Sequence, residues 1–79
     1  ELPMRTFETG IQSALGQLGE FAEPSQQRST VADFIVRENA AGRMSDAQAQ
    51  QLIIQNNLSA QDIQQAENRV GLLEGLRGR

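Results

Sequence analysis

Few side chains in this sequence could do chemistry. The 79 residues contain no His, Cys, Lys, Tyr or Trp, so the usual general bases, thiol nucleophiles and zinc ligands are missing. The serine and threonine hydroxyls remain, but no His, Lys or Cys is present to activate one of them. We therefore predict that the chain is not an enzyme, and that it has no catalytic, cofactor-binding or metal-binding residues.

Carboxylates are the other reactive group. Glu20 and Glu23 are three residues apart and would share one face of a helix. Paired carboxylates cleave glycosidic bonds when a cleft holds the sugar between them, and a chain this short offers little cleft. We interpret the pair as a solvated helix end. Asp33, Asp46 and Asp62 lack the alternating spacing of a calcium loop.

Composition places the chain among small globular domains. It is 38% hydrophobic and 22% charged, with a formal net charge of −3. All seven cations are Arg, which favours a GC-rich bacterial or phage gene; an effector without ubiquitin-acceptor lysines is the alternative. The start lacks an initiator Met and a signal-peptide pattern, and no apolar run is long enough for a membrane span. We expect one helical domain, residues 1–79, as a fragment or processed product of a larger protein.

The spacing of apolar residues predicts an all-α fold of four helices, at about residues 3–22, 25–41, 45–56 and 59–76. Steps of three and four define one stripe of apolar side chains in the first helix and another in the last. The first stripe consists of Met4, Phe7, Ile11, Ala14, Leu18 and Phe21. The second consists of Ile63, Ala66, Val70 and Leu73.

Capping residues predict short turns between these helices. Ser45 with Gln48, and Ser59 with Asp62, have the spacing of capping boxes. Asn56 and Asn57 suit a left-handed turn, and Gly42 suits the end of the second helix. The second helix begins either at Pro24 or at a cap formed by Ser29 and Thr30.

The two stripes predict a protein-binding function. A 3.5-residue apolar repeat buries against another helix, so we expect a protein–protein interaction or assembly module of a virion, a secretion machine or an effector. Its partner is another protein or a second copy, with no membrane span, no nucleic acid and no small-molecule substrate. The residues expected to bind the partner are Phe7, Ile11, Leu18, Phe21, Val70 and Leu73. The alternative is that the stripes bury each other within one chain.

A helix-turn-helix regulator of DNA is the second hypothesis. With Asn57 at the turn, four positions that should be apolar are so: Leu52, Leu58, Ile63 and Ala66. Two other positions, Ile53 and Asn56, do not fit the motif. Arg28, Arg37 and Arg43 form the only locally positive stretch, and a net charge of −3 offers little attraction for phosphates.

Overall fold

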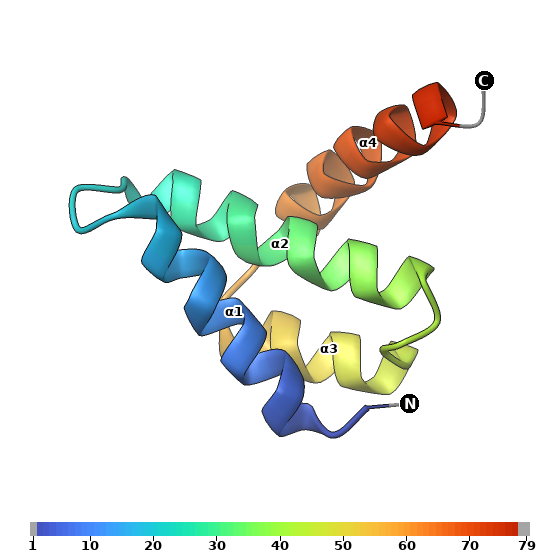
Figure 1. The fold of residues 1–79 in the computed structure, drawn as a ribbon, viewed down its shortest axis with the longest axis horizontal. Coiled ribbons are helices and arrows are strands. Elements are labelled where there is room, and N and C mark those ends of the chain that lie inside the picture. The colour runs from blue at the N-terminus through green and yellow to red at the C-terminus, as the bar shows by residue number, and fades with distance from the viewer. Residues whose placement is uncertain (1, 78–79) are drawn as a thin grey trace.

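The computed structural model describes the backbone of residues 2–77 and the side chains of residues 2–71. Residues 2–77 form four helices and no strand, which confirms the predicted all-α fold. The helices are α1 (Met4–Leu18), α2 (Pro24–Ala40), α3 (Asp46–Gln55) and α4 (Ala60–Arg77) (Figure 1). None of them, over the residues described, is both long and apolar enough to cross a membrane.

The central element is α2, which packs against each of the other three helices (Figure 1). Its buried face consists of Val31, Ala32 and Ile35. Helices α1 and α4 both pack chiefly on α2, so their apolar stripes are not buried mainly against each other. The core around α2 also includes Phe7, Ile11, Met44, Ala49, Leu52, Leu58 and Ala66.

Both predicted capping boxes are present. The backbone N–H of Gln48 donates to Ser45 Oγ at 3.1 Å, and the Ser45 N–H donates to Gln48 Oε1 at 3.0 Å. At the start of α4, the Asp62 N–H donates to Ser59 Oγ at 3.1 Å, and the Ser59 N–H donates to Asp62 Oδ2 at 2.9 Å. Each box satisfies two backbone donors that the helix itself cannot. Of the two residues predicted to suit a left-handed turn, Asn57 adopts it with φ 54°, whereas Asn56 has φ −100°.

The Asp62 carboxylate makes the stability of the fold depend on pH. The hydrogen bond from the Ser59 backbone lowers the pKa of Asp62 below its ordinary value of 3.8. The Ser59 hydroxyl and the positive charge of Arg28 lower this pKa further, by smaller amounts. A pKa that is lower in the folded state stabilises the fold above pH 3.8, and this stabilisation is lost as the pH falls through the folded-state pKa. We expect Asp62→Asn to lose less stability than the wild type between neutral pH and pH values below 3.8. Urea unfolding of both proteins, at neutral pH and at a pH below 3.8, measures this difference. An equal loss of unfolding free energy in the two proteins would contradict the prediction.

The first helix is shorter than predicted. We expected it to reach residue 22, but it ends at Leu18 and the chain turns at Gly19, whose φ is 86°. A residue with a side chain rarely adopts this conformation, whereas glycine does so without strain. The turn takes Phe21 out of the helix and away from the stripe. The prediction that Glu20 and Glu23 share a helix face is wrong for the same reason.

The second helix begins at the earlier of the two predicted positions. Pro24 is its first residue, and Glu23 is its N-cap, with the Glu23 N–H donating to Gln26 Oε1 at 2.9 Å. The alternative cap at Ser29 and Thr30 lies inside the helix. Proline suits a first turn because its missing N–H would have no helical partner there. After the helix the chain turns at Gly42, which has φ 81°.

Gly10 and Gly16 of α1 have different surroundings, so we expect their replacement by alanine to affect stability differently. A Cβ at Gly10 would lie 2.7 Å from Cζ of Phe34, which packs edge-on against Phe7, whereas a Cβ at Gly16 would meet no atom within 4 Å. Alanine favours a helix over glycine by about 1 kcal/mol, but crowding a packed ring offsets that gain. We expect Gly10→Ala to be about 1–2 kcal/mol less stable than Gly16→Ala. Urea unfolding of both variants measures the difference, and a more stable Gly10→Ala would contradict it.

Candidate protein-interaction surface

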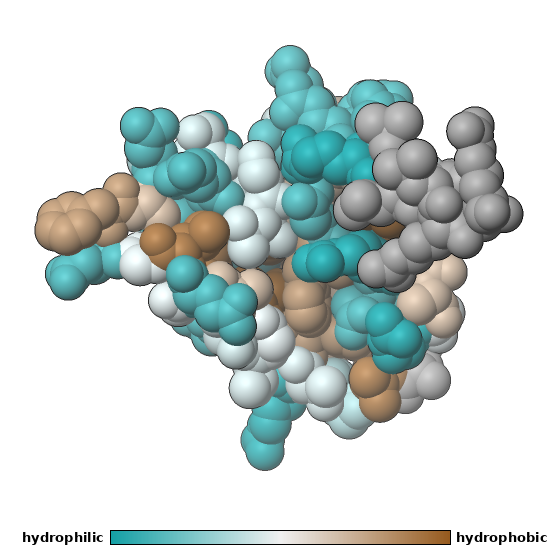
Figure 2. Space-filling model, turned by 45° about the horizontal axis from the view of Figure 1, so that its top comes forward, coloured by the Kyte–Doolittle hydropathy of each residue, from teal (hydrophilic) through white to brown (hydrophobic). Residues whose placement is uncertain are grey.

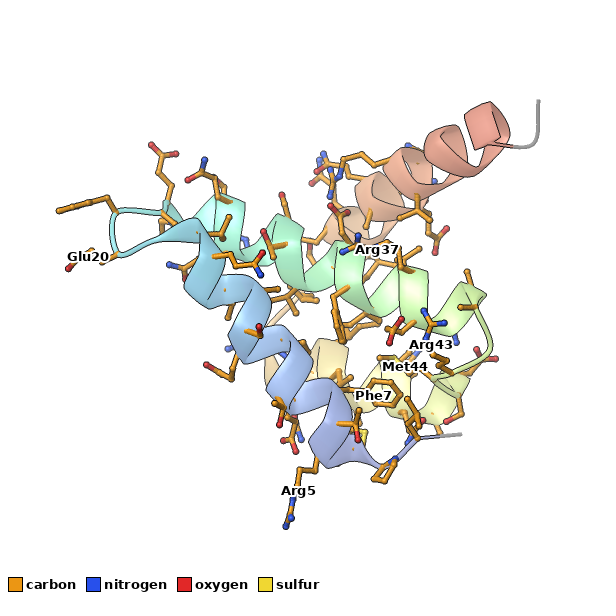
Figure 3. All side chains as sticks on the ribbon, viewed as in Figure 1. Arg5, Phe7, Glu20, Arg37, Arg43 and Met44 are labelled. Atoms are coloured by element: carbon orange, nitrogen blue, oxygen red, sulfur yellow. The ribbon has the colours of Figure 1, made fainter. Side chains whose placement is uncertain are left out.

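The loop between α1 and α2 forms a projecting tip with an apolar residue at its end. The side chain of Phe21 is 94% exposed, and Leu18, the last residue of α1, is 37% exposed. Hydrophobic atoms protrude at this end of the molecule, on the left in Figure 2. Glu20 lies on the same loop (Figure 3). We define the tip as residues 18–23.

The structure separates the predicted partner-binding residues into two groups. Phe7, Ile11 and Val70 are buried in the chain's own core, and Phe7 points between the helices in Figure 3. Leu18 and Phe21 are exposed. The side chain of Leu73 lies outside the described residues. A partner that meets the folded chain can therefore reach Leu18 and Phe21, whereas Phe7 and Ile11 already pack inside.

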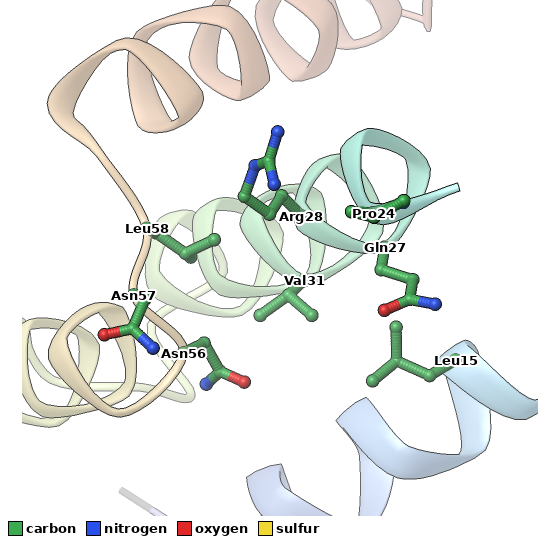
Figure 4. A pocket seen from close by; sticks show the side chains of 8 residues that line it. All are labelled: Leu15, Pro24, Gln27, Arg28, Val31, Asn56, Asn57 and Leu58. Atoms are coloured by element: carbon green, nitrogen blue, oxygen red, sulfur yellow. The ribbon is translucent and has the colours of Figure 1, made fainter. Parts of the chain in front are cut away.

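A pocket of about 270 Å³ opens close to the tip (Figure 4). Its walls come from the end of α1, the first two turns of α2 and the turn between α3 and α4. The lining residues are Leu15, Pro24, Gln27, Arg28, Val31, Asn56, Asn57 and Leu58. Four of these are apolar, and Val31 and Leu58 belong to the buried core. We call this hollow the Arg28 pocket.

Arg28 is the charged residue of that pocket. Its Nε lies 3.9 Å from Asp62 Oδ2, at the outer limit of an ion pair, and its side chain is 47% exposed. Figure 4 shows Arg28 extending from α2 toward α4. An exposed pair at this distance holds the guanidinium weakly, so its donors remain accessible to a further ligand. The sequence alone did not identify this pocket, because its residues come from three separate segments.

A second hollow lies between α2, α3 and α4. It has a volume of about 460 Å³ and is lined by apolar residues such as Ile53 and Ile63, with Glu67 and Asp46 among its polar residues. A neighbouring hollow of about 330 Å³ shares Ile53, Ile63 and Glu67. Ile54, the residue next to Ile53 on α3, is 72% exposed. The sequence analysis predicted neither of these two hollows.

Among the arginines whose side chains the structure describes, Arg28, Arg43 and Arg69 each lie within ion-pair distance of a carboxylate. Arg69 Nη2 lies 2.8 Å from Asp33 Oδ1 and joins α4 to α2. Arg43 Nε donates to Glu38 Oε2 at 3.0 Å, and this hydrogen bond raises the pKa of Arg43. Ion pairing of this kind reduces the positive charge available to phosphates. Within residues 2–71, no group of three or more His, Cys, Asp or Glu side chains could hold a metal ion.

The turn between α3 and α4 agrees with the helix-turn-helix hypothesis, but the packing of these helices does not. Leu52, Leu58 and Ala66 are buried, and Asn57 makes the turn between α3 and α4. In that motif the second helix packs against the first and presents its outer face to the DNA groove. Here α4 packs mainly on α2. Asp62 lies in the first turn of α4, which would be the reading helix. Its negative charge would there face the DNA phosphates and repel them.

Family models, curated proteins and solved structures were compared with the chain, and none matches it. Function is therefore inferred from the surfaces of the chain itself. Among the surfaces that the structure describes, the tip combines a nearly fully exposed aromatic side chain with an adjoining pocket.

Proposed function

We propose that the chain is a non-enzymatic protein–protein interaction or assembly module that binds its partner through the tip. The observation that supports this most strongly is the 94% exposure of Phe21. Aromatic residues are enriched at the centres of protein interfaces because they bury a large rigid area at a small cost in conformational entropy. An isolated exposed phenylalanine at the end of a projecting loop fits that use.

The position of the tip also supports this proposal. Phe21 follows Gly19, whose positive φ turns the loop away from α1. Leu18 adds exposed apolar area to the same tip, and Glu20 and Glu23 are its two acidic residues. An apolar centre with a charged rim is the usual arrangement in a protein interface. The expected partner therefore offers an apolar pocket with a positive edge.

DNA binding has less support than protein binding. The net charge is −3, and Arg28, Arg43 and Arg69 each lie within ion-pair distance of a carboxylate. Sequence-independent DNA affinity comes mainly from cations that neutralise phosphates. A mobility shift that weakens steeply with salt and with Arg37→Ala would favour the regulator hypothesis over the proposal.

Site-specific photocrosslinking tests the proposed function. A photoreactive phenylalanine analogue replaces Phe21 in the chain, which is expressed in its native cells. On irradiation it is expected to form a covalent adduct with a protein. The same analogue at position 54, where Ile54 is 72% exposed, is the matched control and is expected to give much less adduct. An adduct at position 21 no more abundant than that at position 54 would overturn the proposal.

A further inference from the structure

The tip and the Arg28 pocket of the same chain have complementary properties. The tip presents one phenyl ring, and the pocket is a hollow of about 270 Å³ with Leu15, Val31 and Leu58 in its walls. A cavity of about 150 Å³ is sufficient for a benzene ring in a protein interior. By volume, this open hollow is therefore large enough for the side chain of a phenylalanine.

The charges of the two surfaces are also complementary. Glu20 and Glu23 flank Phe21 in the sequence, whereas Arg28 lines the pocket with its side chain 47% exposed and lies 3.9 Å from Asp62. The Arg28 guanidinium extends toward α4 (Figure 4), so it lies at the rim of the pocket. A guanidinium near a carboxylate gains a charge-assisted hydrogen bond. A phenylalanine with acidic neighbours suits this pocket, because its ring would meet the apolar walls and a carboxylate would meet Arg28 at the rim.

The tip does not fill the pocket of its own chain, because Phe21 is 94% exposed. Both features nevertheless lie at the same end of the molecule: Pro24, in the pocket wall, is three residues from Phe21. A two-fold axis near this end would bring the tip of each copy to the pocket of the other. Such an interface is self-complementary, as the interfaces of most small homodimers are.

We propose that the partner of the tip is a second copy of this chain, and that each copy inserts Phe21 into the Arg28 pocket of the other. This inference rests on the proposed function, since it names the partner of the same tip. Two inserted rings bury about 300–500 Å² from the phenylalanines alone, which is below the area of a standard stable interface, about 1,200 Å² or more. The dimer is therefore weak and depends on concentration.

Sedimentation equilibrium of the whole chain over a wide range of concentrations tests this dimer. The wild type is expected to rise above its monomer mass of 8.7 kDa as the concentration increases. Phe21→Ala removes the inserted ring and is expected to raise the dissociation constant about tenfold or more. Its matched control is Ile54→Ala, which removes another exposed apolar side chain and is expected to leave association unchanged.

Two further variants test the pocket side. Gln27→Trp fills the hollow from an exposed position on α2, and Arg28→Glu reverses its charge; both are expected to weaken association as Phe21→Ala does. The controls are Gln65→Trp and Arg5→Glu, which make the same changes at exposed positions outside the pocket. Circular dichroism establishes that each variant is folded before its mass is measured.

The outcomes separate this inference from the proposed function. A wild type that stays at 8.7 kDa at every concentration overturns the dimer, and a crosslink from position 21 to a different protein then leaves the interaction module standing with that protein as its partner. Association that survives Phe21→Ala or Gln27→Trp unchanged also overturns the dimer. If the control variants weaken association as much as the tip and pocket variants, the dimer is also overturned. Association would not then depend on the tip and the pocket.

Discussion

Phe7→Ala is expected to lower the free energy of unfolding by about 3–5 kcal/mol. The side chain of Phe7 is completely buried, and its ring centroid lies 6.5 Å from that of Phe34 at an interplanar angle of 72°. Alanine would leave a cavity between α1 and α2 and remove this edge-to-face contact. A single core of this size provides only about 3–5 kcal/mol of net stability, so the variant is expected to be largely unfolded at 25 °C.

Far-ultraviolet circular dichroism and urea unfolding measure this loss. The matched control is Ile54→Ala, whose side chain is 72% exposed, and its free energy of unfolding is expected to change by no more than about 0.5 kcal/mol. A Phe7→Ala variant with the same unfolding midpoint as the wild type would contradict the placement of Phe7 in the core.

Phe21→Asp is expected to have the opposite pattern, with binding lost and stability kept. Phe21 is 94% exposed and lies outside the helices, so its replacement removes little packing and is expected to change the free energy of unfolding by at most about 0.5 kcal/mol. An aspartate has no ring, and its charged carboxylate would lose water on entering an apolar pocket, so it could not fill the space that the phenyl ring fills. Partner affinity is expected to fall by at least about tenfold.

Binding and unfolding measured on the same Phe21→Asp sample distinguish the two roles. Sedimentation reports association, and urea unfolding reports stability. A variant that unfolds at a lower urea concentration than the wild type would place Phe21 in the stabilising core. Unchanged affinity for the partner would remove the tip from the interface.

The capped turns were predictable from the sequence because their determinants are local. Ser45 with Gln48, and Ser59 with Asp62, form their hydrogen bonds between residues three apart, so the spacing alone contains the information. Asn57 and Gly42 were predictable for a related reason, since few residue types adopt a positive φ. Four helices and their approximate bounds follow from these signals and from the apolar spacing.

The end of the first helix was not predictable from the apolar spacing. Phe21 continues the steps of three and four that begin at Met4, and this spacing is the same whether the helix stops at residue 18 or residue 22. Three glycines, Gly10, Gly16 and Gly19, could each have weakened the helix. Only the backbone conformation identifies Gly19 as the residue where the chain turns.

The candidate site could be predicted only in part for the same physical reason. Phe21 and Leu18 belong to the predicted stripe, but periodicity does not distinguish the buried members of a stripe from the exposed ones. The Arg28 pocket joins residues from Leu15 to Leu58, and no sequence pattern links these positions. Its existence depends on how α1 and the turn after α3 pack against α2.

The central claim is that Phe21 of one copy contacts the Arg28 pocket of another, and an isotope-filtered nuclear Overhauser experiment tests it most directly. A mixture of unlabelled chain and ¹³C-labelled chain, at a concentration where sedimentation detects the dimer, reports only contacts between copies. We expect cross-peaks between the unlabelled Phe21 ring and the labelled methyl groups of Leu15, Val31 and Leu58. Intermolecular cross-peaks that join Phe21 to other residues and not to these three would contradict the proposed pairing.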